Sequence, residues 1–323
     1  MAESGRTVRF CGQHVPLDAE QVRCANEPVS SLEPLRPLAR LRELALLASN
    51  PHRRLEHPLS DLSPLAGLSH LEVLELSRSQ VRDLSPLREL SNLRRLDLSR
   101  TPVTDLGPLA GLSKLERLEL GATEVADLSP LARLEHLRDL NLSHTEVEDL
   151  SPLRGLRALA SLKIDHTRVA DLGPILALPA VAAAEQLDLS GTRVRSVAGL
   201  EAASRLRELD LIQSPVADLS PLCAMPSLEV LRLDGVAATD LSPLAALPKL
   251  RVLTLAGTKV ADLSPLAGLA HLKELWLNET KVADLSPLMK LPALELLSVQ
   301  GAPVPAAQVK ELQRRHSKLE VAE

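Results

Sequence analysis

The stretch LERLELGATEVADLSPL, residues 115–131, decides the fold of this chain. Its last five residues, Asp-Leu-Ser-Pro-Leu, return along the sequence, beginning at Asp61, Asp83, Asp127, Asp149, Asp218, Asp240, Asp262 and Asp284. Variants of the phrase begin at Ser31, Asp105, Asp171 and Ser196. Most steps are 22 residues long, as in 83 − 61, and the longest is 61 − 31 = 30. One short unit, used twelve times, therefore builds most of the chain.

Each unit carries the signals of one coil. In the quoted stretch, Leu118 and Leu120 alternate with polar residues, which indicates a short strand. Ser129 is expected to be the N-cap of a single 3₁₀ or α turn, with Pro130 at its first helical position. One coil cannot bury its leucine face alone, so we expect the coils to stack into a solenoid.

The pattern Leu-x-x-Leu-x-Leu-x-x-Thr-x-Val-x-Asp-Leu-x-Pro-Leu resembles the 22-residue leucine-rich repeat of bacterial internalin-type proteins. The resemblance implies an α/β solenoid: a curved right-handed coil with a parallel sheet on its concave face and short 3₁₀ or α segments on its convex face. Two features depart from the family. Internalin-type proteins carry a secretion signal, and residues 1–13 hold no apolar run of that length. The family's Asn after the strand is replaced by hydroxyl residues, which we interpret as a ladder bonding the loop backbone of adjacent coils: Ser79, Thr101, Thr123, Thr145, Thr167, Thr192, Ser214, Thr258 and Thr280.

The sequences at both ends of the repeat array are typical of caps. We expect residues 1–30 to form an N-terminal cap with a degenerate first coil, 31–305 about twelve repeats in one continuous domain, and 306–323 a capping helix and tail. Residues 22–24 stand one 22-residue step ahead of 44–46 and mark the degenerate coil. At the other end, Val309 and Leu312 have helical spacing with charges opposite, as in an amphipathic helix over 306–316.

Two insertions interrupt the register. The first, within residues 49–60, carries His52, Arg53, Arg54 and His57 and is expected to project from one rim, either as part of a binding surface or as a tolerated loop. The second, near 177–186, is rich in alanine and predicts a longer helical turn.

Composition narrows the functional class. The 323 residues have a net charge of −5, which argues against a general surface for nucleic acid or acidic lipid. One Phe, one Trp and no Tyr leave an aliphatic core. No apolar run is long enough to span a membrane. Cys11, Cys24 and Cys223 form no CxxC pair and are expected to be reduced, mostly buried thiols, with a Cys11–Cys24 bridge as the alternative. We therefore expect a cytoplasmic, monomeric bacterial protein.

Nothing in the motifs predicts catalysis or a bound cofactor. The sequence has no phosphate-binding glycine loop, no G-x-S-x-G and no H-E-x-x-H. His144 and His166 stand 22 residues apart, with Asp165 beside them, which is a weak candidate for Zn²⁺. The alternatives are two solvated histidines or a pH-sensitive contact.

The repeat register assigns the residues of the concave face. Glu75, Asp97 and Glu119 are predicted to form an acidic column beside Arg95 and Arg117, either charge-balanced in water or offset by a cation or a basic partner.

Trp276, the only tryptophan, is predicted on the same open face rather than in the core. Val230, Val252 and Leu296 lie in the adjoining column, so the group has the composition of an interface hot spot. The alternative is a ring that lies flat on the sheet with no partner.

We therefore expect a non-enzymatic protein-interaction module, an adaptor, scaffold or inhibitor, that holds a protein partner in its concave face. The alternative is a regulatory subunit of an enzyme, since the repeat also resembles phosphatase regulatory subunits and GTPase-activating repeat proteins, and Arg53 and Arg54 are the rim candidates for a GTPase activator. The sequence does not decide whether the concave face, the convex side or the 49–60 insertion is the main binding surface.

Overall fold

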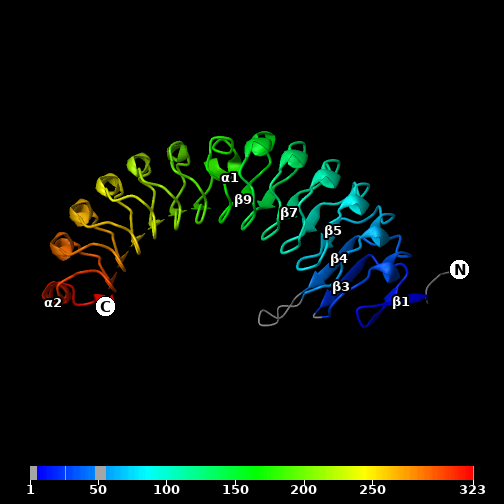
Figure 1. Ribbon diagram of the computed structural model, residues 1–323, viewed down its shortest axis with the longest axis horizontal. Coiled ribbons are helices and arrows are strands. Elements are labelled where there is room, and N and C mark those ends of the chain that lie inside the picture. The colour runs from blue at the N-terminus through cyan, green and yellow to red at the C-terminus, as the bar shows by residue number, and fades with distance from the viewer. Residues whose placement is uncertain (1–5, 26, 48–55, 323) are drawn as a thin grey trace. The chain divides into compact units, whose positions relative to one another are not determined.

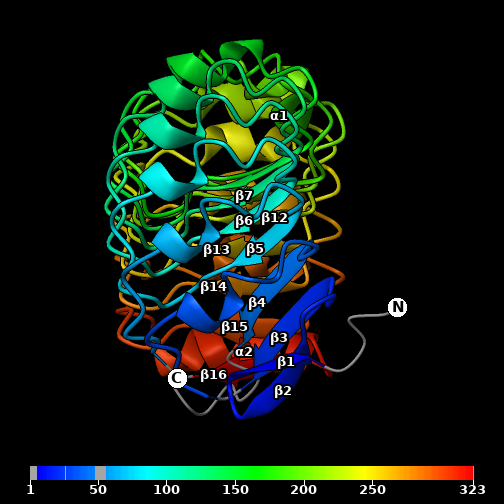
Figure 2. The same ribbon diagram turned by 90° about the vertical axis from the view of Figure 1, so that its right-hand side faces the viewer.

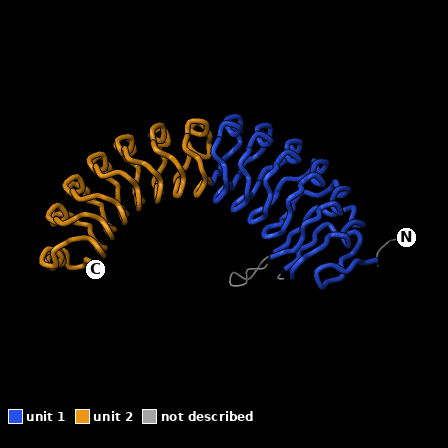
Figure 3. Tube along the Cα trace, viewed as in Figure 1, with its two compact units in different colours: residues 1–163 blue, residues 164–323 orange. Residues whose placement is uncertain are grey.

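The computed structural model describes residues 6–25, 27–47 and 56–322, and the chain divides into two compact units, 1–163 and 164–323 (Figure 3). Each unit is a leucine-rich-repeat solenoid with its own seven-stranded parallel sheet, β3 to β9 in unit 1 and β10 to β16 in unit 2. In each unit the strands line the inner side of the curve and the helical turns line the outer side (Figure 1). The predicted fold class is confirmed.

Unit 1 begins with an antiparallel hairpin and continues as stacked coils. Its strands are β1 (Thr7–Phe10), β2 (Gln13–Pro16), β3 (Gln21–Ala25), β4 (Glu43–Leu47), β5 (Val73–Glu75), β6 (Arg95–Asp97), β7 (Arg117–Glu119), β8 (Asp139–Asn141) and β9 (Ser161–Lys163). Its 3₁₀ turns are Glu33–Leu35, Ser63–Leu65, Ser85–Leu87, Gly107–Leu109, Ser129–Leu131 and Ser151–Gly155.

Unit 2 repeats the same coil and ends in a helix and a last strand. Its strands are β10 (Gln186–Asp188), β11 (Glu208–Asp210), β12 (Val230–Arg232), β13 (Val252–Thr254), β14 (Glu274–Trp276), β15 (Leu296–Ser298) and β16 (Glu320–Ala322). Its helices are α1 (Pro179–Ala182) and α2 (Ala306–Arg315), and its 3₁₀ turns are Leu200–Ala202, Ser220–Ala224, Ser242–Ala246, Ser264–Gly268 and Ser286–Lys290.

Where the repeated phrase begins with aspartate, that aspartate, not the serine two residues later, bonds to the start of the turn; Ser31 and Ser196 take this place in the two coils whose phrase begins with serine. In the quoted unit Leu128 is the N-cap and makes no side-chain capping bond, so the predicted capping role of Ser129 is wrong. Instead the Ser129 backbone N–H donates to Asp127 Oδ1 at 2.8 Å, and the Ser129 hydroxyl donates to the same oxygen at 2.6 Å. These two bonds hold the pKa of the exposed Asp127 carboxyl below its usual value. The same backbone bond recurs at Asp61, Asp83, Asp149, Asp218, Asp240, Asp262 and Asp284.

The buried hydroxyl groups bond within their own coil and do not form the predicted ladder between coils. Thr123 is 5% exposed and its Oγ1 donates to the Leu120 carbonyl, three residues earlier, at 2.7 Å. The same bond is made by Thr101, Thr145, Thr167, Thr192, Ser214, Thr258 and Thr280. The Ser79 hydroxyl is the exception, because it is buried without a partner in the described residues. Each of these hydroxyls except that of Ser79 therefore closes the turn after its own strand.

A disulfide ties the N-terminal hairpin to the first strand of the sheet. The bond joins Cys11, in the turn between β1 and β2, to Cys24 of β3, which overturns the expectation of three reduced thiols in favour of the alternative. The labels of β1, β2 and β3 stand together in Figure 2. Cys223 is free and exposed, not buried as expected. The degenerate coil is present in the predicted register, since Val22, Arg23 and Cys24 pair with Leu44, Ala45 and Leu46.

The C-terminal residues close the sheet of unit 2 with a helix and a strand. The helix expected over 306–316 is α2, and its Val309 and Leu312 are buried. The Gln308 Oε1 accepts a hydrogen bond from the Leu285 backbone N–H at 2.6 Å, which anchors the helix to the preceding coil. The tail then adds β16, which pairs with β15 and was not predicted.

The two insertions behave differently. Arg53 and Arg54 lie outside the described residues, whereas His57 is 1% exposed and does not project from a rim as expected. Its Nδ1 accepts a hydrogen bond from the Val29 backbone N–H at 3.2 Å, and burial lowers its pKa. The alanine-rich insertion forms α1, an α-helical segment in the predicted place, but its four residues are fewer than the five of the 3₁₀ turn Ser151–Gly155, so the prediction of a longer turn is wrong.

Candidate functional site

The strands of unit 2 place one apolar patch on the inner face of its sheet. Pairing in register brings Val230 beside Val252, Thr254 beside Trp276, and Glu274 beside Leu296. The leucines between these positions, such as Leu253 and Leu275, are fully buried on the other side of the sheet. The period of two therefore turns the patch toward solvent, as the repeat register predicts.

Trp276 lies half-buried within this patch rather than fully exposed. Its strand neighbours are Thr254 on β13 and Ser298 on β15, both small, so the ring has room to lie against the sheet. Val230, Val252 and Leu296 are half-buried as well. We name these four residues the tryptophan patch; Glu274 stands between Val252 and Leu296 in their column.

Two acceptors that the sequence reasoning missed fix the small residues beside the ring. Asp234 Oδ2 accepts a hydrogen bond from the Thr254 hydroxyl at 2.7 Å, and its Oδ1 accepts the Ala256 backbone N–H at 2.6 Å. In the same way Asn278 Oδ1 accepts the Ser298 hydroxyl at 2.5 Å and the Gln300 backbone N–H at 3.1 Å. The signal was available, since Asp234 and Asn278 each stand one residue after the second strand leucine.

A charged cluster borders the tryptophan patch on the β11 side. Arg232 of β12 forms an ion pair with Glu208 and lies 3.9 Å from Asp210. Burial raises the pKa of Asp210, and the nearby Asp188 and Asp234 carboxylates add to the increase, while the Ile212 N–H and Arg232 oppose it. The inner face of unit 2 therefore carries its acidic cluster on β10 and β11 and its apolar residues on β12 to β15, across the sheet.

Unit 1 carries the predicted acidic column on the same face of its own sheet. Glu75, Asp97 and Glu119 pair in register on β5, β6 and β7, and all three are half-buried. Burial raises the pKa of Glu75, and the Asp97 and Glu43 carboxylates add to the increase. Burial also raises the pKa of Asp97, where two hydrogen bonds from Ser99 oppose the increase and the Glu119 carboxylate adds to it. Arg117 Nε lies 3.4 Å from Glu119 and 3.9 Å from Asp139, so it offsets one end of the column. Arg95 lowers the pKa of Glu75 by its positive charge.

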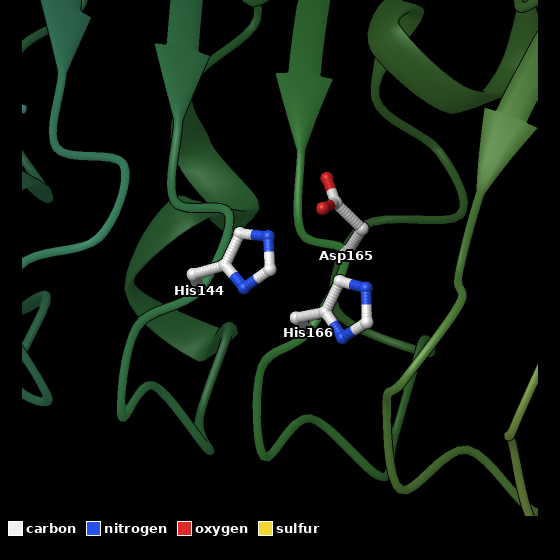
Figure 4. Close-up of side chains that lie close together, drawn as sticks. All are labelled: His144, Asp165 and His166. Carbon is white, nitrogen blue, oxygen red and sulfur yellow. The ribbon is translucent and has the colours of Figure 1, made fainter.

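The three residues of the weak zinc hypothesis follow strands and are drawn in Figure 4. His144 belongs to unit 1 and is exposed, while Asp165 and His166 belong to unit 2, half-buried and exposed respectively. Both histidines have a left-handed backbone, with φ of 58° and 53°. A zinc site at these residues stays a prediction, which calorimetric titration with Zn²⁺ tests.

Within the described residues, no helix has the length and apolar content needed to cross a membrane.

The comparisons with known proteins agree on the fold. A family model of leucine-rich repeats, in two copies, matches residues 91–133 and 248–288. No curated protein matches the sequence significantly. Among solved structures, an internalin, InlF, from Listeria monocytogenes is 26% identical over 97% of this chain and 90% of its own, with a TM-score of 0.81.

Two more distant structures share the fold alone. The functional domain of InlJ from Listeria monocytogenes is 17% identical, with a TM-score of 0.71 over 95% of this chain and 63% of its own. The ectodomain of the plant receptor kinase GASSHO1/SCHENGEN3 from Arabidopsis thaliana, in complex with CASPARIAN STRIP INTEGRITY FACTOR 2, is 19% identical, with a TM-score of 0.68 over 95% of this chain and 41% of its own.

Proposed function

We propose that this chain, a leucine-rich-repeat protein that resembles the Listeria internalins, is a non-catalytic protein-binding module that holds its partner on the inner face of unit 2. Leucine-rich-repeat domains are typically protein-binding modules and generally non-catalytic. The finer roles of adaptor, scaffold or inhibitor all require such a surface, so the surface is the first claim to test.

The tryptophan patch is the observation that carries the proposal. An aromatic ring with aliphatic neighbours on a solvent-facing sheet supplies a large apolar contact area. Aromatic anchors of this kind often contribute ~2 kcal/mol or more to binding. The Asp234 and Asn278 bonds hold the residues on both sides of the ring, so little side-chain freedom is left to lose when a partner docks.

The acidic column of unit 1 supports a second, weaker contact. Three carboxylates in neighbouring coils, with raised pKa values at Glu75 and Asp97, are incompletely offset by the arginines beside them. A basic segment of the partner would relieve this repulsion, mainly by increasing the association rate.

Affinity capture from the native lysate, with wild type and Trp276→Ala compared side by side, tests the proposal. We expect wild type to retain a protein that Trp276→Ala loses, with Gln186→Ala on β10 as the matched control because Gln186 is an exposed inner-face residue outside the patch. Thermal unfolding of all three proteins confirms that they fold. Equal capture by wild type and Trp276→Ala would contradict the proposal.

The cytoplasmic location and the monomeric state stay predictions. The Cys11–Cys24 disulfide bears on the first, because such bonds persist in oxidising compartments and are rare in the cytosol. Alkylation of free thiols before lysis, followed by mass spectrometry, shows whether the pair is bridged in the cell. Sedimentation analysis of the purified chain tests the second.

A further inference from the structure

A pocket of about 340 Å³ opens in unit 2, and none of its lining residues belongs to the tryptophan patch. It lies at the residues that come just before β12, β13, β14 and β15 rather than on the strands themselves. Its lining consists of Glu229, Lys249, Arg251, His271, Lys273 and Ala293. Four of these six residues are basic, in a chain whose net charge is −5.

The cations of this pocket are only partly offset by carboxylates. Glu229 Oε2 lies 3.8 Å from Arg251 Nη1, and its Oε1 lies 3.8 Å from Arg207 Nη1, so one carboxylate serves two guanidinium groups. Lys273 Nζ donates to Glu295 Oε1 at 2.9 Å. Within the described residues Lys249 forms no ion pair. An anion entering the pocket would therefore meet donors that the protein has not saturated.

A second pocket, of about 320 Å³, shares Ala293 with the first and extends the basic lining to the C-terminal cap. Arg315, His316 and Lys318 line it together with Glu295. The His316 Nε2 atom is buried and has no hydrogen-bond partner in the described residues. A buried ring nitrogen without a partner costs free energy, which a ligand able to bond with it would recover.

The equivalent flank of unit 1 shows that the repeat does not require this charge pattern. There the residues before the strands alternate in sign, and Arg42 pairs with Glu72 while Arg94 pairs with Glu116. In unit 2, Arg251 and Lys273 occupy neighbouring coils, joined by the Lys273 N–H to Arg251 carbonyl bond of 2.8 Å. Like charges this close repel unless an opposite charge offsets them.

We propose that the two pockets together, the lateral basic pocket, bind the carboxylate side chains of an acidic peptide segment on a protein partner. Neighbouring coils are only ~5 Å apart, so the cations that the coils contribute lie close enough together to meet several carboxylates of one peptide. The aliphatic stems of the lysines and arginines, with Ala293, offer apolar walls for the methylene groups of glutamate. The net negative charge of the chain disfavours a long nucleic acid at the same place.

Fluorescence anisotropy with a fluorescein-labelled oligo-glutamate peptide, at low ionic strength and with the full chain, tests the proposal. We expect saturable binding that Arg251→Ser/Lys273→Ser weakens by about tenfold or more, as the loss of charge-assisted bonds predicts. Glu229→Gln is expected to tighten binding by about two- to fivefold, because it removes the competing carboxylate. The matched control, Arg42→Ser/Arg94→Ser in unit 1, should change affinity by less than about twofold.

Three results would overturn the proposal. The first is the absence of saturable binding by a folded wild-type chain. The second is an equal loss in the unit 1 control, which would indicate diffuse attraction by surface charge. The third is binding of a single-stranded oligonucleotide of equal charge at least as tightly as the peptide, which would assign the pocket to a nucleic acid instead. Thermal unfolding of each variant separates lost binding from lost folding.

Discussion

The two units are built from the same coil but offer different inner faces. Unit 1 presents the acidic column of Glu75, Asp97 and Glu119 with arginines beside it, whereas unit 2 presents the tryptophan patch. The buried leucines barely change, because each must fill the same space between neighbouring coils. The difference teaches that stacking dictates the inward positions and leaves the outward positions free to specify binding.

The largest expected effect tests whether the core is equivalent in the two units. Leu140→Ala in unit 1 and Leu275→Ala in unit 2 each remove a fully or almost fully buried side chain and should cost about 2–5 kcal/mol of unfolding free energy. Asn141→Ala, one position on, should cost only about 0.5–1.5 kcal/mol, the worth of the bond from the Ser143 N–H to its Oδ1. Urea denaturation measures all three. Similar losses at Leu140 and Asn141 would break the inward–outward assignment.

The next prediction compares the N-terminal cap of unit 1, which a disulfide holds, with the C-terminal cap of unit 2, which α2 forms. Cys11 and Cys24 are 13 residues apart, and a loop of that size predicts a loss of about 3 kcal/mol when Cys11→Ser/Cys24→Ser opens it. Hydrogen exchange should show faster exchange in β1 to β4 of unit 1, while the strands of unit 2, closed by α2, keep their protection. Unchanged exchange throughout would show that the disulfide does not stabilise the cap.

Partner binding should distinguish the two inner faces. Once a partner is captured, Trp276→Ala should weaken its binding by about 30-fold, or ~2 kcal/mol. Glu75→Lys should weaken it less, and added salt should reduce that smaller effect because screening shortens its range. Isothermal titration calorimetry at two salt concentrations measures both. A larger effect at Glu75 than at Trp276 would transfer the main contact to unit 1.

The smallest effect concerns pH. The folded-state pKa values of Glu75 and Asp97 lie above their usual values, so the folded state holds these protons more tightly than the unfolded state does. The stability that these protons contribute is fully present at a pH below the usual carboxyl pKa. It is lost as the pH rises from that value through the raised folded-state pKa. Glu75→Gln should stabilise the protein by less than about 1 kcal/mol at neutral pH and by nothing in acid below the usual pKa. Urea denaturation at the two pH values checks the sign.

Much of this molecule could be predicted from the sequence because the repeat fixes the register. The strand positions and the buried leucines follow from one period, and the capping helix follows from the helical spacing of Val309 and Leu312. The same register correctly predicted that Trp276 and Glu75 lie on the solvent-facing side of the sheet rather than in the leucine core.

The features that the sequence did not reveal depend on contacts rather than on period. The N-cap role predicted for Ser129 is wrong, because the carboxylate of Asp127, two residues earlier, accepts the backbone N–H of Ser129. The buried position of His57 depends on Val29, which lies 28 residues away. The sequence did not predict the lateral basic pocket, because its cations come from three coils and no single coil carries an unusual number of basic residues.

The hydroxyl bonds inside each coil bear on how such a chain grows. Thr123 and its equivalents bond to a carbonyl of the same coil, so a coil brings its own polar partners with it. A gene segment encoding one coil can therefore be duplicated or lost in the middle of the array without stranding a buried donor in its neighbours. Other side chains do reach into a neighbouring coil, among them Asp234, Asn278, His57 and Gln308. A change in the length of the array is therefore expected to cost most where coils share such bonds, as the coils around Trp276 do.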